Sequence, residues 1–118
     1  MALQVSEQAD RWCVSFGEVS MLGEANLPEL NSGLVGVVRQ AVATKKEVII
    51  DLRGVQLMTS SVIGQFLMAN RMTKEASIDL RLANVGEELR DALRSIRLLN
   101  TFRFCDDDST GESNAVSA

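Results

Sequence analysis

Every second residue from Trp12 to Phe16 is apolar, which predicts a half-buried β-strand. Gly17 interrupts the alternation, and residues 18–22 predict a second short strand. Because so few residues separate the two segments, we expect them to form a hairpin.

Residues 48–52 form an apolar run interrupted only by Asp51. Such a run is typical of a central strand that is covered on both faces. Alternation returns at Ile78, Leu80 and Leu82 and predicts another strand, and residues 102–105 predict a short final one.

Apolar residues spaced three and four apart predict a first helix from Asn26 to about Ala43. Asn26 is the expected N-cap, and Pro28 is tolerated in the first turn because its missing N–H has no partner there. Gly33 and Gly36 weaken this helix, and we interpret them as marking close approach to a neighbouring element.

A second helix is predicted to begin at three consecutive hydroxyl residues and to end near Lys74. At least one of those hydroxyls should cap the helix by accepting a free backbone N–H, a contact worth about 0.5–2 kcal/mol. The hydroxyl residues are Thr59, Ser60 and Ser61. The apolar face of a third predicted helix consists of Leu89, Ala92, Leu93 and Ile96.

The predicted order is therefore β-β-α-β-α-β-α-β, and the βαβ steps imply at least partly parallel pairing. The expected fold class is α/β, with a mixed sheet of four to five strands and helices packed on it. The 118 residues suffice for one domain. We assign it to residues 1–105 and expect residues 106–118 to form an acidic, disordered tail.

The charge distribution argues against nucleic acid and anionic membranes as partners. The tail alone carries the net charge of −4, through Asp106, Asp107, Asp108 and Glu112, and the remainder is neutral. A neutral body gains no counterion release on a phosphate backbone. No secretory signal or membrane-spanning run is evident, so we expect no membrane insertion and a cytoplasmic location.

The sequence offers few groups for catalysis. It contains no histidine or tyrosine and no phosphate-binding glycine loop. Cys13 and Cys105 are read as buried small hydrophobes, and Asp51 as a strand-end hydrogen-bonding residue. We therefore expect no enzyme activity, no metal site and no cofactor.

The stretch 51–64, DLRGVQLMTSSVIG, resembles the signature of STAS domains, in which Asp-Ser-Ser-Gly-Leu-Gly opens a helix after a strand. Residues 22–26 resemble the family's Gly-Glu-Leu-Asp segment, and residues 84–104 resemble its third helix and final strand. The likeness is to STAS domains of the bacterial anti-sigma factor antagonist kind, and it spans roughly residues 11–105.

The resemblance implies a protein-interaction module that regulates transcription by binding a partner that is both serine kinase and anti-sigma factor. It assigns the phosphorylated position to Ser60, with Ser61 and then Thr59 as the next candidates. The residues expected to bind the partner are Glu24, Asn26, Thr59, Ser60, Ser61, Val62 and Met68. Met68 or Met72 either forms a surface contact patch or packs between neighbouring elements.

Three positions depart from the family pattern. Thr59 and Asn26 each replace an Asp, and Val62 replaces a Gly. These changes support an alternative function, a constitutive STAS subunit of a lipid-transport ABC complex or a stress-sensing assembly without a phospho-switch. Nucleotide binding is a third possibility, for which the sequence supplies no phosphate loop.

Overall fold

The computed structural model describes residues 3–105 of the chain. The predicted acidic tail lies outside these residues. Two 3-10 turns, η1 (Glu24–Asn26) and η2 (Leu99–Thr101), accompany the regular elements. The helices are α1 (Leu27–Thr44), α2 (Ser60–Glu75) and α3 (Glu87–Ser95). The strands are β1 (Gln4–Glu7), β2 (Arg11–Ser15), β3 (Met21–Leu22), β4 (Glu47–Asp51), β5 (Leu57–Met58), β6 (Leu80–Ala83) and β7 (Arg103–Phe104).

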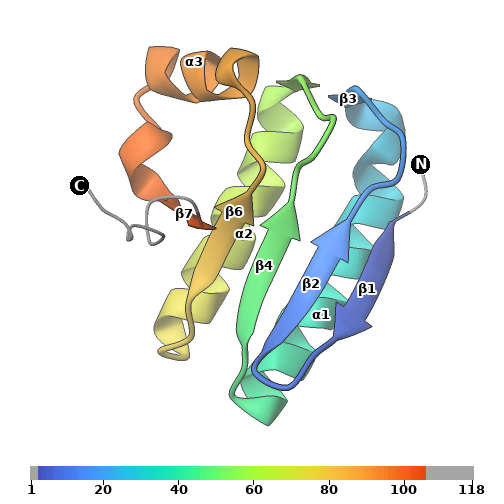
Figure 1. Ribbon diagram of the computed structural model, residues 1–118, viewed down its shortest axis with the longest axis vertical. Helices are drawn as coiled ribbons and strands as arrows, with labels where there is room; N and C mark the ends of the chain where they lie inside the picture. The colour runs from blue at the N-terminus through green and yellow to red at the C-terminus, as the bar shows by residue number, and fades with distance from the viewer. Residues whose placement is uncertain (1–2, 106–118) are drawn as a thin grey trace.

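Five strands form one mixed sheet in the order β1-β2-β4-β6-β7, which confirms the predicted α/β class. All neighbours pair in parallel except β1, which runs antiparallel to β2. Successive right-handed crossovers that move in one direction place their helices on one face of the sheet. Accordingly, α1 and α2 both lie behind the sheet, and α3 lies across its upper end (Figure 1).

The predicted hairpin between residues 12–16 and 18–22 is wrong. Only Met21 and Leu22 are extended, and they pair in parallel with β5 in a separate two-stranded sheet. The chain turns at Gly17, where φ is +63°, and leaves the main sheet. The antiparallel partner of β2 is instead β1, which contains a single large apolar residue and is exposed along its whole length.

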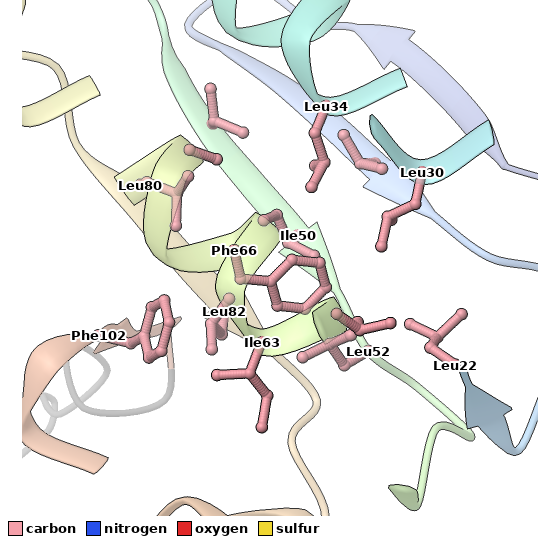
Figure 2. Close-up of a cluster of buried hydrophobic side chains, with 14 of the residues drawn as sticks. Leu22, Leu30, Leu34, Ile50, Leu52, Ile63, Phe66, Leu80, Leu82 and Phe102 are labelled. Carbon is pink, nitrogen blue, oxygen red and sulfur yellow. The ribbon is translucent and has the colours of Figure 1, made fainter. Parts of the chain in front are cut away.

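The helix-facing side of the sheet forms the hydrophobic core (Figure 2). Phe66 of α2 lies at its centre, fully buried, between Ile50 and Leu82 of the sheet and Ile63 of its own helix (Figure 2). Its ring stacks on Phe16 with centroids 6.4 Å apart. Burial of these side chains supplies most of the favourable free energy of folding.

The predicted central strand is confirmed, because β4 is the middle strand of the sheet and its residues 48–50 are buried on both faces. The face of the sheet away from the helices is otherwise polar. Ile49 is nevertheless buried there, in register between Cys13 and Arg81. Long side chains shield an apolar neighbour with their aliphatic stems. Ion pairs link adjacent strands on this face, including Arg81 with Glu47 at 3.8 Å.

Two further predictions of burial are wrong. Ile96 is 50% exposed because α3 ends at Ser95, so Ile96 lies beyond the helix's apolar face. Both Cys13 and Cys105 are half-buried rather than core residues. Burial still raises the pKa of the Cys13 thiol.

The two glycines of α1 differ in their surroundings. A Cβ on Gly33 would lie 2.7 Å from Cδ1 of Leu3, which confirms close approach at this position. The Leu3 N–H also donates to Glu29 Oε2 at 3.2 Å, so the N-terminal segment is held over the helix. Gly36 has no neighbour within 4 Å of such a Cβ, and the prediction of close approach there is wrong.

We expect Gly36→Ala to raise the free energy of unfolding by about 0.5–1 kcal/mol, because alanine costs less backbone entropy in a helix. Gly33→Ala should gain less, because its methyl group displaces Leu3. Urea titration of both variants, alone and combined with Leu3→Ala, measures the difference. In the Leu3→Ala background, Gly33→Ala and Gly36→Ala should raise the free energy of unfolding equally. If the difference between them is as large as in the unaltered protein, the contact between Gly33 and Leu3 does not explain it.

Candidate functional site

The start of α2 and the segment before α1 lie together at one end of the sheet. Leu52 and Val55 are buried after β4, and the chain then reaches β5 and Thr59. Parallel pairing of β3 with β5 brings the two segments into contact, and the Thr59 N–H donates to the Leu22 carbonyl at 3.1 Å. This pairing places η1, which contains Glu24, next to the first turn of α2.

Ser60 is the first residue of α2, and its side chain is exposed. Residues 60–75 are helical as predicted. The first N–H groups of a helix have no partner within it, and the helix dipole favours negative charge there. Because Ser60 is exposed, its hydroxyl is accessible to a kinase. Because the helix start favours negative charge, the fold can tolerate a phosphate on this hydroxyl.

The predicted side-chain cap of α2 does not form. Thr59 occupies the N-cap position with an extended backbone, and its carbonyl accepts the Ile63 N–H at 3.0 Å. Its hydroxyl is buried without a hydrogen-bond partner among the described residues, and its methyl group faces Gly23. The Thr59 side chain is thus turned towards η1 rather than over the end of its own helix.

Glu24 is exposed and lies beside these hydroxyls. The nearby Ser61 hydroxyl, followed by that of Thr59, holds the pKa of the Glu24 carboxyl below its usual range. The Thr59 hydroxyl has the smaller effect, and its oxygen makes no hydrogen bond of ordinary geometry among the described residues. We therefore regard Ser61 as the main partner of Glu24, and the surface beside Ser60 as negatively charged.

We expect Ser61→Ala to raise the pKa of Glu24, as measured by a carbon-detected NMR titration. The depressed pKa stabilises the fold above the pKa of the unfolded chain, and this contribution is lost as the pH falls through the folded pKa. Ser60→Ala is the matched control and should leave the titration unchanged. An unaltered Glu24 pKa in Ser61→Ala would show that the contact is absent.

The other predicted partner-binding residues differ in accessibility. Asn26 is engaged locally, because its Oδ1 accepts the Gly23 N–H at 2.8 Å, and it makes no side-chain cap on α1. Val62 is fully buried, so it cannot contact a docked partner, and that assignment is corrected. Met68 and Met72 are both half-buried, and Met72 packs against the core.

Sequence reasoning missed two exposed apolar residues beside Ser60. Met21 and Leu57 are opposite each other in the β3–β5 pair and are 53% and 55% exposed. A Cβ on Gly23 would contact the ends of both Met21 and Thr59, so the Met21 side chain extends towards the start of α2. The exposure of Leu57 depends on the pairing of β5 with β3, so no local pattern in the sequence indicates it.

The chemical inventory of residues 3–105 is limited. This part of the chain holds no group of three or more acidic or cysteine side chains placed to bind a metal ion. Among the same residues, no helix combines the length and apolar character that crossing a bilayer requires.

Comparisons with known proteins identify the family. The fold is similar to that of an anti-sigma-factor antagonist (STAS) domain protein from Planctomyces limnophilus, with a TM-score of 0.78 and 21% identity over 86% of this chain and 87% of that one. It is also similar to the anti-sigma factor antagonist SpoIIAA in its unphosphorylated form, with a TM-score of 0.62 and 16% identity over 79% of this chain and 82% of that one.

At these identities, the structural likenesses show the fold alone. No curated protein sequence matches the chain significantly. The model of the STAS domain family matches residues 30–110. Since that match covers most of the chain, the protein belongs to the STAS domain family.

Proposed function

We propose that this protein is an anti-sigma factor antagonist, which binds a partner of the anti-sigma factor and serine kinase type. Phosphorylation of Ser60 by that partner releases the complex. In this role the protein acts in the cytoplasm by binding, without catalysis of its own, and so regulates transcription.

The observation that carries the proposal is the position of Ser60. Its exposed hydroxyl lies at the start of α2, beside Glu24 and the exposed Met21–Leu57 pair. We call these four residues the docking surface. An apolar centre with a charged rim is the usual composition of a protein–protein interface. The fold that presents this surface is shared with anti-sigma factor antagonists.

The same geometry supports a switch. A phosphate at Ser60 adds a charge of about −2 next to the free N–H groups at the start of α2. These groups and the helix dipole favour negative charge, so the folded domain accepts the phosphate. A partner that covers the docking surface would instead have to bury those charges beside the Glu24 carboxylate. Desolvation and like-charge repulsion then oppose binding.

The direct test is to recover the protein together with its native partners and to measure its intact mass. We expect an anti-sigma factor of the kinase type in the complex, and ATP should add one phosphate that Ser60→Ala eliminates. Recovery of such a partner with the phosphate on another residue would refute the switch. Failure to recover any such partner would refute the proposed function.

A constitutive STAS subunit remains the second candidate, favoured by Val62 and Thr59. The Val62 side chain is packed in the core where the family pattern has Gly, and the Thr59 side chain cannot supply the charge of the family's Asp. Val62 makes the first turn of α2 stiffer than the family's Gly would, and Thr59 makes it less acidic than the family's Asp would. Recovery of an ATPase subunit with unmodified Ser60 would favour this function.

A further inference from the structure

A cleft of about 570 Å³ lies at the carboxyl ends of β2 and β4. Residues 17–20, which follow β2, form one wall, and residues 53–54, which follow β4, form the other. Gln4 of β1 closes one side. Neither Ser60 nor any other residue of the docking surface lines this cleft. Ligands of α/β sheets commonly bind beyond the carboxyl ends of the strands.

The walls of the cleft are fixed by the backbone. Gly17 and Gly54 both have positive φ, of +63° and +84°, which glycine adopts without strain. The Ser20 carbonyl accepts the Gln56 N–H at 2.8 Å and so ties one wall to the chain that follows the other. The cleft is therefore formed before any ligand enters, which lowers the entropic cost of binding.

Charged residues of both signs line the cleft. Glu18 and Arg53 belong to opposite walls, both are exposed, and within residues 3–105 neither side chain makes an ion pair or hydrogen bond. Asp51 also lines the cleft, and its Oδ1 accepts hydrogen bonds from the Arg53 N–H at 3.0 Å and from Asn84 Nδ2 at 2.8 Å. The site thus offers two carboxylates, one of them held in place, and one guanidinium.

We propose that this cleft binds a small zwitterionic ligand, a free amino acid or a short peptide. The ammonium group would pair with Glu18 and Asp51, and the carboxylate with the Arg53 guanidinium. The apolar part would lie against Val19, which also lines the cleft. Two carboxylates disfavour a nucleotide or another polyanion at the same place.

The test is a titration of the isotope-labelled full chain, followed by backbone amide NMR, with the standard L-amino acids and diglycine. We expect saturable shifts at residues 17–20 and 53–54 with at least one of these probes. For a responding amino acid, the analogue without the ammonium group and the analogue without the carboxylate should each bind about tenfold more weakly, or 1.4 kcal/mol.

Substitutions at two exposed residues, Arg53 and Glu18, test which group of the ligand each residue contacts. Arg53→Gln should abolish the preference for the amino acid over its analogue without a carboxylate. Glu18→Gln should reduce the preference over the analogue without an ammonium group, because Asp51 still pairs with the ammonium. The absence of saturable shifts with every probe would overturn the proposal. Equal binding of the amino acid and both analogues to the unaltered protein would overturn it as well.

Discussion

Replacing Phe66 with alanine is expected to lower the free energy of unfolding by about 3–5 kcal/mol. The side chain is fully buried where α2 faces the sheet, and its ring stacks on Phe16 with an angle of 27° between the planes. Alanine leaves a cavity that close-packed neighbours fill only in part. Small domains are stable by about 5–15 kcal/mol, so this loss is a large fraction of the total.

Chemical denaturation followed by circular dichroism measures the effect. If Phe66→Ala does not fold, Phe66→Leu keeps the prediction measurable, because it retains part of the apolar volume and should lose less than half as much. Arg71→Ala is the control on the same helix, since Arg71 is exposed, and it should change stability by less than about 0.5 kcal/mol. Equal losses at positions 66 and 71 would show that Phe66 is not central to the core.

Local pattern was sufficient to predict the strands that the helices cover. Val14, Ile50 and Leu82 are all fully buried on the helix-facing side, so their alternation or apolar run carries a strong signal. The exposed strand β1 has no such signal, because none of its four residues is buried. The parallel pairing of β3 with β5 joins residues far apart in sequence, and no local pattern encodes it.

The candidate site was predictable to a similar degree. The start of the second helix at residues 59–61 was predicted correctly, because hydroxyl residues before an apolar helix mark a helix start. The role of Ser60 stays a prediction. The exposure of Met21 and Leu57 was not predictable, since apolar residues are ordinarily read as buried. The orientation of Thr59 also follows from a tertiary neighbour, Gly23, rather than from its own helix.

Under the proposed function, Ser60→Asp should weaken binding of the anti-sigma partner at least 100-fold relative to Ser60→Ala, which corresponds to about 2.8 kcal/mol. Aspartate in the first turn of α2 is favoured by the helix dipole, so the variant should fold at least as stably as Ser60→Ala. The loss therefore arises at the interface, where the new carboxylate and Glu24 would both have to be desolvated. Calorimetric titration with the purified partner measures the affinities, and thermal unfolding measures the stabilities.

Leu57→Ala tests whether the partner binds the docking surface, independently of the phosphorylation switch at Ser60. This change adds no charge, and it removes an exposed apolar side chain whose loss should cost the isolated domain little. We expect it to weaken partner binding about tenfold in the Ser60→Ala background, as the loss of an apolar contact at an interface centre does. If Leu57→Ala weakens binding while Ser60→Asp and Ser60→Ala bind alike, the partner docks at this surface but charge at Ser60 does not control it. If neither change at position 57 nor at position 60 alters the affinity, the partner binds elsewhere on the domain.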